Sequence, residues 1–271
     1  KITGPPTATG IINHGVLYYY VFAPFYLISG GDPAAISAFL RVLNASGVFI
    51  LYPLVLILFG EVAAVISVLF FAVSYEQIQF ALFLNHPSLA VISVLIFYFG
   101  LAYWIFRKKV WGLYISLFGL GLSIQFEFVE TQLIAIFVLF VLFFRNELPR
   151  LNVKNVIISA LAFFLPVSSF IVSEIKNNFI IIKNMPSGTG LMSSPSQFLF
   201  IINRHIHDNL AANNVMSIVV GLIFLILLLN FVIKKTYIKQ IIFLTLWFFG
   251  GLMVYFFTNK TTRYTWGKIK N

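Results

Sequence analysis

The sequence predicts an all-α, polytopic membrane protein, and two observations support this prediction. The mean hydropathy is +0.97, and hydrophobic residues make up 60% of the chain whereas charged residues make up 10%. Such values lie far outside the range of soluble domains. Long apolar runs also recur along the chain, and a segment that crosses lipid must satisfy its own backbone hydrogen bonds, as a helix does. We therefore expect about eight transmembrane helices and one additional helix at the membrane surface.

The expected surface helix spans residues 16–29. Its apolar run would be roughly 21 Å long at 1.5 Å per residue, which is short of a hydrocarbon core about 30 Å thick. Pro24 lies in its middle, where it removes one backbone donor and bends a helix. Tyr18, Tyr19 and Tyr20 stand near its start, and tyrosine favours the headgroup level. We therefore predict an amphipathic helix that lies along the membrane surface.

The segments that follow are interpreted as eight transmembrane helices, separated by polar turns, glycines or cations. Their ranges are 34–58, 62–82, 89–106, 110–125, 131–144, 156–172, 216–233 and 241–258. This interpretation divides the chain into three parts. Residues 1–173 form a transmembrane core with the surface helix and six spans, residues 174–214 an outer loop, and residues 215–271 a C-terminal helix pair with an outer tail.

The distribution of cations predicts the orientation. Loops 107–109, 145–155 and 234–240 carry three Lys or Arg residues each, whereas the turns at 83–88 and 126–130 carry none. Because cytoplasmic loops are enriched in cations, these three loops are expected in the cytoplasm. The surface helix and both ends of the chain are then outside. The net charge of +10 is accordingly assigned to loops that face anionic lipid, and not to nucleic-acid binding.

Three short motifs near the start of the chain carry a resemblance to a known family. They read Thr3-Gly4-Pro5-Pro6, His14-Gly15-Val16-Leu17-Tyr18-Tyr19-Tyr20 and Gly30-Gly31-Asp32-Pro33. Together they resemble the juxtamembrane segment of the GT-C glycosyltransferases, especially the protein O-mannosyltransferases and the bacterial aminoarabinose transferases. Val16 departs from the family pattern, which usually has proline there. The resemblance extends to about Ser173.

The resemblance implies an enzyme that transfers a sugar from a polyprenyl-phosphate donor to a lipid, glycan or protein acceptor. The expected location is the outer face of a prokaryotic plasma membrane, or the corresponding face of an equivalent endomembrane. In this family the catalytic carboxylate lies in the first outer loop, which we expect upstream of Lys1. No catalytic base is therefore assigned here, and the 271-residue chain is expected to be a fragment that is inactive alone.

The sequence requires no cofactor and gives no support for a divalent metal. It contains no cysteine, which excludes thiolate ligands. His205 and His207 would point about 200° apart on a helix, and no third ligand is in sight.

Polar residues expected near the outer leaflet are the candidates for binding substrate, because ionisable groups at membrane depth are costly unless they are paired or face water. They are His14, Tyr18, Arg41, Glu76, Asn85, His86, Gln125, Glu127 and Glu130. The competing interpretation is that the carboxylates simply ring the helix ends in headgroup water. Glu76 could equally hydrogen-bond its neighbours in sequence.

Among these candidates, Gln125 and Glu127 are the strongest for lining the donor or acceptor site, because they lie at the end of the run Gly119-Leu120-Gly121-Leu122-Ser123-Ile124. The resemblance to the aminoarabinose transferases implies a polar residue at the site in this place. Arg41 could hold a lipid phosphate through its guanidinium group or snorkel to the interface. For Asn85 and His86 the favoured interpretation is a helix cap.

Two other functions compete with the transferase. A transporter or flippase of a lipid-linked sugar would need broken helices or charges at mid-membrane and inverted repeats, which the sequence pattern does not indicate. A non-enzymatic scaffold would leave the polar residues at one face unexplained. An Asp-Glu pair in an outer loop before residue 1 would favour the enzyme.

Overall fold

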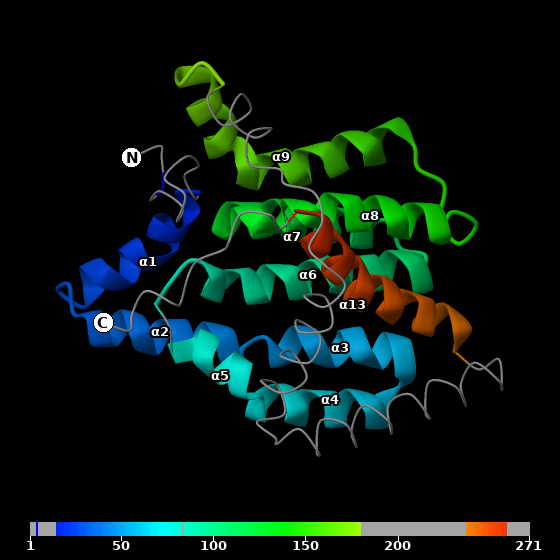
Figure 1. Ribbon diagram of the computed structural model, residues 1–271, viewed down its shortest axis with the longest axis horizontal. Coiled ribbons are helices and arrows are strands. Elements are labelled where there is room, and N and C mark those ends of the chain that lie inside the picture. Colours follow the sequence, from blue (N-terminus) through cyan, green and yellow to red (C-terminus); the bar gives the residue numbers. More distant parts are fainter. Residues whose placement is uncertain (1–3, 5–14, 83, 180–236, 259–271) are drawn as a thin grey trace, which may run out of the picture.

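The computed structural model describes Gly4 and residues 15–82, 84–179 and 237–258, and within them every regular element is a helix. The prediction of an all-α fold is therefore confirmed. The long helices lie side by side, and α1 (Leu17–Ile28) inclines across one end of the bundle (Figure 1). We call this end the outer end and the opposite one the inner end.

The surface helix predicted over 16–29 corresponds to α1, which contains Pro24. A tight turn follows, in which Gly30 and Gly31 adopt φ values of 64° and 88° that favour glycine. Asp32 then begins α2 (Pro33–Ala45), because its Oδ1 accepts a hydrogen bond from the Ala34 N–H at 2.9 Å. The turn thus reverses the chain at the outer end.

The segment predicted as a helix over 34–58 consists of α2 and α3 (Val48–Phe59), with a short break between them. The single helix predicted over 62–82 is interrupted, since α4 (Glu61–Val73) ends at Ser74 and α5 (Tyr75–Leu82) begins there. Ser74 has extended backbone, with φ −62° and ψ 126°, and its Oγ accepts a hydrogen bond from the Gln77 N–H at 3.5 Å. A serine that bonds the backbone locally in this way competes with continuation of the helix.

The remaining described elements match the other predicted spans to within a few residues. They are α6 (Pro87–Phe106), α7 (Trp111–Phe126), the short 3₁₀ turn η1 (Phe128–Thr131), α8 (Gln132–Phe143), α9 (Val153–Lys176) and α13 (Ile238–Thr258). α9 contains Pro166, and Figure 1 shows this helix bent toward its C-terminal end. A proline inside a helix removes one backbone hydrogen bond and bends it.

Three described segments are long and apolar enough to cross a membrane, namely Pro33–Phe59, Pro87–Phe106 and Val153–Lys176. The other apolar helices of the described part are shorter, and the predicted span 216–233 lies outside it. Large hydrophobic side chains also cover the outside of the bundle, where Phe49 is 79% and Val62 75% exposed. An apolar surface of this kind suits lipid contact. The number of spans and the division into three parts stay predictions.

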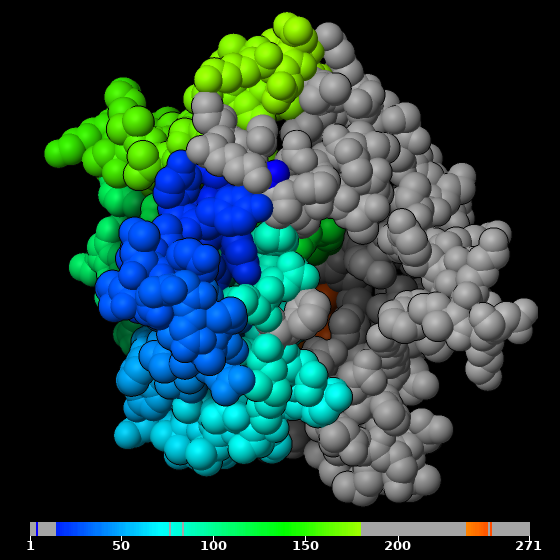
Figure 2. Space-filling view, turned by 90° about the vertical axis from the view of Figure 1, so that its left-hand side faces the viewer, coloured from blue at the N-terminus to red at the C-terminus, as the bar shows by residue number. Residues whose placement is uncertain are grey.

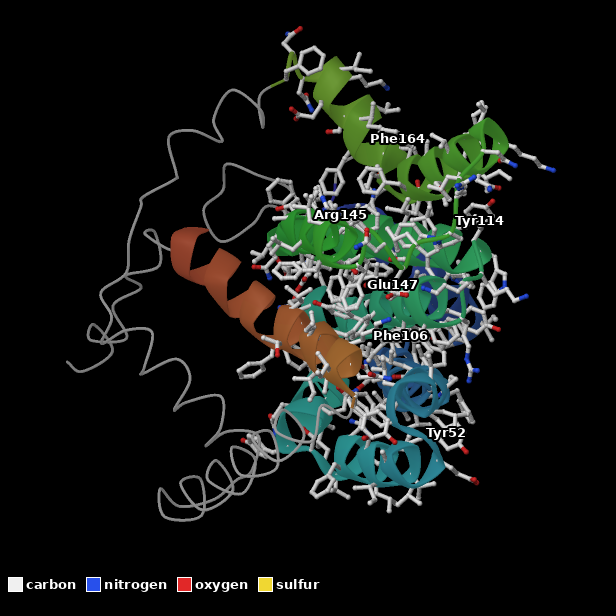
Figure 3. The ribbon with its side chains drawn as sticks, turned by 90° about the vertical axis from the view of Figure 1, so that its right-hand side faces the viewer. Tyr52, Phe106, Tyr114, Arg145, Glu147 and Phe164 are labelled. Carbon is white, nitrogen blue, oxygen red and sulfur yellow. The ribbon has the colours of Figure 1, made fainter. Side chains whose placement is uncertain are left out.

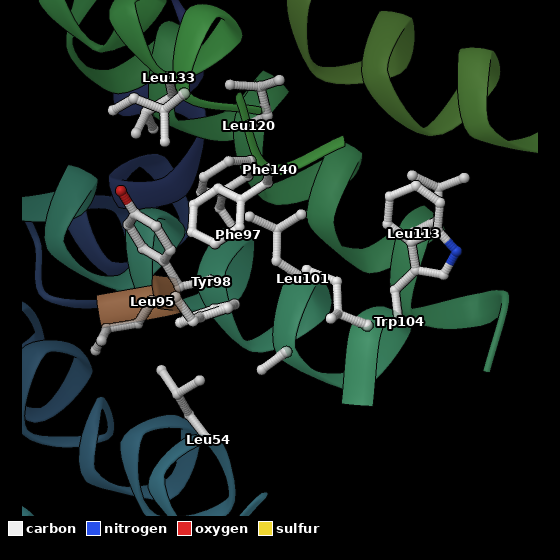
Figure 4. Close-up of a cluster of buried hydrophobic side chains, with 14 of the residues drawn as sticks. Leu54, Leu95, Phe97, Tyr98, Leu101, Trp104, Leu113, Leu120, Leu133 and Phe140 are labelled. Atoms are coloured by element: carbon white, nitrogen blue, oxygen red, sulfur yellow. The ribbon is translucent and has the colours of Figure 1, made fainter. Parts of the chain in front are cut away.

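The centre of the bundle is the contact between α6 and α7, which is made by glycines. A Cβ added at Gly100 would lie 2.3 Å from the backbone N of Ser116, and one added at Gly112 would lie 2.6 Å from the backbone N of Trp104. The two backbones therefore touch, as in other membrane helix pairs with small residues at the interface. Large apolar side chains surround this contact (Figure 4). They include Leu54, Phe97, Tyr98, Leu101, Leu113, Leu120 and Phe140.

Ionic contacts join two loops and the start of α13 at the inner end. The Lys108 Nζ lies 2.6 Å from Glu147 Oε2, and the Lys239 Nζ contacts Glu147 Oε1. Figure 3, which views this end, shows Glu147 among the ends of the helices. The loops at 107–109 and 145–152 and the start of α13, predicted to share one side of the membrane, therefore meet at one end of the bundle. Which side of the membrane this is stays a prediction.

Candidate functional site

The outer end brings together α1, the start of α6 and the turn between α7 and α8. In Figure 2, which faces this end, the yellow-green end of α9 lies on one side of α1 (blue). The cyan atoms of α5 and of the start of α6 lie on its other side. Six of the nine candidate positions lie at this end, namely Tyr18, Asn85, His86, Gln125, Glu127 and Glu130. Arg41 is exposed in α2, Glu76 lies in α5 with its side chain outside the described part, and His14 lies outside the described residues altogether.

Gln125 occupies a buried position near the end of α7, with only 1% of its surface exposed. Its Nε2 donates a hydrogen bond to the Ser169 Oγ of α9 at 2.5 Å, and its backbone carbonyl accepts one from the Gly15 N–H at 3.0 Å. One residue thereby joins α7, α9 and the segment that leads into α1. A structural role is thus evident for Gln125, and its contact with substrate stays a prediction.

The two carboxylates that follow lie in the turn between α7 and α8. Glu127 ends α7 with extended backbone, and its carbonyl accepts a hydrogen bond from the Glu130 N–H at 3.0 Å. Burial, followed by the charge of Glu127, raises the pKa of Glu130 from 4.5 to about 7, against the opposing effect of a hydrogen bond with Gln132. A carboxyl group that titrates near neutral pH can either accept or donate a proton under working conditions. Such a perturbed group is typical of functional sites.

Tyr18 and His86, two candidates that are far apart in sequence, contact each other. Their ring centroids lie 4.5 Å apart with an edge-to-face geometry, which is a favourable arrangement for aromatic rings. The contact joins α1 to the start of α6. Two helix ends that carry candidate residues are therefore held together at the outer end.

The expected helix cap at Asn85 is wrong in its detail. The Asn85 Oδ1 accepts a hydrogen bond from the adjacent His86 N–H at 2.8 Å, and no side chain caps α6. Pro87 does stand at the first helical position, where its missing donor costs nothing. The start of α6 thus depends on the proline and not on an asparagine cap.

Sequence reasoning missed two polar residues that are buried toward the outer end. Asn44 in α2 is fully buried, and its Oδ1 accepts a hydrogen bond from the Gln77 Nε2 of α5 at 3.4 Å. Glu174 in α9 is only 8% exposed. The signal for Asn44 was available, because it follows Ile36 and Leu40 at four-residue intervals and so lies on their buried helix face.

The described part of the chain contains no group of three or more His, Asp or Glu side chains that could hold a metal ion. His205 and His207 lie outside the described residues. The described candidates at the outer end supply carboxyl, amide, imidazole and phenol groups.

The comparisons with known proteins give one match. The family model described as dolichyl-phosphate-mannose-protein mannosyltransferase matches residues 13–171, which is 159 of the 271 residues. No curated protein and no solved structure matched the chain. The matched region begins at the His14-Gly15 motif and contains α1 through most of α9. The chain therefore belongs to the dolichyl-phosphate-mannose-protein mannosyltransferase family, which consists of membrane glycosyltransferases of the GT-C type that use polyprenyl-phosphate-linked sugars.

Proposed function

We propose that this chain forms part of an enzyme that transfers a sugar from a polyprenyl-phosphate donor to a lipid, glycan or protein acceptor. The reaction would take place at the outer face of a prokaryotic plasma membrane. The observation that carries the proposal is the family match over residues 13–171. The carboxylates Glu127 and Glu130 at the end of the bundle that α1 crosses support it.

The proposed reaction sets clear chemical requirements. The acceptor hydroxyl oxygen attacks C1 of the sugar, the bond from C1 to the phosphate oxygen breaks, and the phosphate leaves with the bonding electrons. A carboxylate must take the hydroxyl proton, and the resemblance to the family leads us to expect that base in an outer loop upstream of Lys1. Donors must also hold the phosphate as negative charge develops on it.

Glu127 and Glu130 are proposed to contact substrate and not to serve as the base. A carboxylate accepts hydrogen bonds from sugar hydroxyls, and bonds to an ionised acceptor are stronger than neutral ones. Glu130 ionises near neutral pH, so its carboxyl group can be protonated before substrate binds and ionised when it accepts the stronger hydrogen bonds from the sugar hydroxyls. Tyr18 and His86, in contact with each other, are proposed to border the same site.

The experiment that tests the proposal uses the full-length protein in proteoliposomes with labelled polyprenyl-phosphate sugars. The measured product is free polyprenyl phosphate, formed only when an acceptor is present. Glu127→Gln and Glu130→Gln are each expected to reduce this release by about tenfold or more, since one lost charge-assisted contact in the transition state is worth roughly 1.5–3 kcal/mol. Glu61→Gln is the matched control, because Glu61 is an exposed carboxylate at the start of α4, away from the turn that holds Glu127 and Glu130.

The outcomes distinguish the parts of the proposal. Full activity in both outer variants would remove Glu127 and Glu130 from the site. Absence of any acceptor-dependent release by the parent protein, across polyprenyl-phosphate hexoses and pentoses, would contradict the transferase assignment itself.

One observation favours a second candidate function, the movement of a lipid-linked sugar across the membrane. The break at Ser74 divides an apolar stretch into α4 and α5, and discontinuous helices are typical of transporters. The same vesicles test this candidate. Transfer of labelled donor between leaflets without product formation would favour the transporter, and product formation without such transfer would exclude it.

A further inference from the structure

The segment that precedes α1 is attached to the end of α7 by its backbone. The last carbonyl groups of a helix have no partner within the helix and need one elsewhere. The carbonyl of Gln125 belongs to this set, since α7 ends at Phe126, and it accepts the hydrogen bond from the Gly15 N–H at 3.0 Å. A residue 110 positions earlier in the sequence thus completes the end of α7.

The contact has room only for glycine at position 15. A Cβ added to Gly15 would lie 1.7 Å from the Gln125 Oε1, 2.6 Å from its Cδ and 2.4 Å from its backbone oxygen. The first two atoms belong to a side chain that is itself held, because its Nε2 donates to the Ser169 Oγ of α9. Any larger residue at position 15 would therefore displace either the incoming segment or the Gln125 side chain.

Both residues of this contact are close in sequence to elements of the candidate site. α1 begins at Leu17, two residues after Gly15, and Val16 between them is only 5% exposed. In the other direction, Glu127 follows Gln125 by two residues and begins the turn that holds Glu130. A shift of Gly15 relative to Gln125 would therefore move α1 relative to the two carboxylates.

We propose that the contact between Gly15 and Gln125 is a positioning device, which sets α1 in one fixed place relative to the turn with Glu127 and Glu130. The proposal deepens the transferase function above and rests on it. Gly15 and Gln125 would thus affect the reaction by positioning α1 and the two carboxylates. The expected effect is large, because misplacement of reacting groups by about 1 Å can reduce a rate by about 100-fold.

The first measurement is independent of activity. The 271-residue sequence has no cysteine, so spin labels can be attached at Leu27→Cys in α1 and Val129→Cys in the turn, which are 78% and 54% exposed. In the full-length protein in proteoliposomes, Gly15→Ala is expected to shift or broaden the distance distribution between the labels. Adding Gln125→Ala to Gly15→Ala removes two of the three close contacts, so this double variant should return part of the way to the parent.

The second measurement is the kinetics of sugar transfer. Gly15→Ala is expected to lower kcat by about tenfold or more while the KM for the donor changes little, since misplacement acts on the transition state. The double variant should regain part of the lost kcat, and this rescue is what a merely structural defect would not produce. Gly250→Ala is the matched control, because a Cβ there meets its nearest neighbour, Ile136, at an ordinary 3.4 Å.

Each outcome decides the proposal. An unchanged label distance in Gly15→Ala, or a double variant no closer to the parent, would overturn it, as would a shifted distance with unchanged kcat. If Gly15→Ala does not fold, Gln125→Met serves instead, because it keeps the volume and removes the bond to Ser169. It should change distance and kcat in the same direction, and parental values for both would overturn the proposal. If the parent shows no sugar transfer, the transferase function fails, whereas the label distances still report on the contact.

Discussion

Two carboxylates on either side of α8 have opposite environments. Glu147 follows α8 at the inner end, where hydrogen bonds from Lys108 and then Lys239 lower its pKa from 4.5 to about 2. Glu130 precedes α8 at the outer end, where burial and the charge of Glu127 raise its pKa to about 7. The same side chain is therefore firmly ionised at one end of the bundle and titrates near neutrality at the other.

The difference supports the proposal that the outer end, and not the inner one, holds the functional site. Pairing with two cations favours the ionised form of Glu147 and joins two loops to the start of α13. Burial and the neighbouring charge of Glu127 do the reverse for Glu130, since both disfavour its ionised form. A fold that tolerates such a cost at a half-buried position usually gains function from it. The comparison is thus consistent with a stabilising role for Glu147 and with the substrate contact proposed for Glu130.

The largest expected effect concerns the pH dependence of transfer. If ionised Glu130 binds substrate, kcat/KM should fall as the pH is lowered through about 7, the pKa of that group, by up to tenfold per pH unit. In Glu130→Gln this fall of kcat/KM at low pH should be absent, and the activity should be lower than that of the parent above pH 7. The measurement is polyprenyl phosphate release between pH 5 and 9. An identical fall in parent and variant would assign the titration to another group.

A smaller effect is expected when the inner end is altered. Glu147→Gln should lower the thermal midpoint by about 2–4 °C near pH 7 and leave kcat per folded molecule unchanged, because exposed ion pairs contribute about 0.2–1 kcal/mol each. Because the folded-state pKa is depressed, this contribution is present above pH 4.5 and disappears as the pH falls toward 2. The two proteins should therefore melt alike at the acid end of the range. A persistent difference there would contradict the ionic origin.

At the outer end, the stability of the protein should depend on pH in the opposite direction. The pKa of Glu130 is raised in the folded protein, so its ionisation costs stability that is absent below pH 4.5 and grows up to about pH 7. Glu130→Gln should therefore stabilise the protein at pH 8 relative to the parent and make no difference at pH 4. This gain in stability with loss of activity would be the mark of a functional residue.

Features that depend on local pattern could be predicted from the sequence. The bounds of α1, the all-α fold and the grouping of the 107–109 and 145–155 loops followed from hydropathy, Pro24 and charge. The break at Ser74 could not be predicted, because there a local hydrogen bond competes with an apolar pattern typical of an unbroken span. Features that depend on distant partners could not be predicted either. Gln125 contacts Ser169, which is 44 positions later in the sequence, and Gly15, which is 110 positions earlier. No spacing rule identifies such partners.

The smallest expected effect tests whether the two lysines at the inner end are equivalent. Lys108 donates to both the carboxylate and the backbone carbonyl of Glu147, whereas Lys239 contacts the carboxylate alone. Lys108→Ala should therefore lower the free energy of unfolding more than Lys239→Ala does, by about 1 kcal/mol or less for one hydrogen bond, and so give the lower thermal midpoint of the two. In 1 M salt the Lys239→Ala effect should nearly vanish, because screening removes an exposed ion pair. The backbone bond is less sensitive to salt, so part of the Lys108→Ala effect should remain, and equal losses in both variants would show that the carboxylate alone joins these loops.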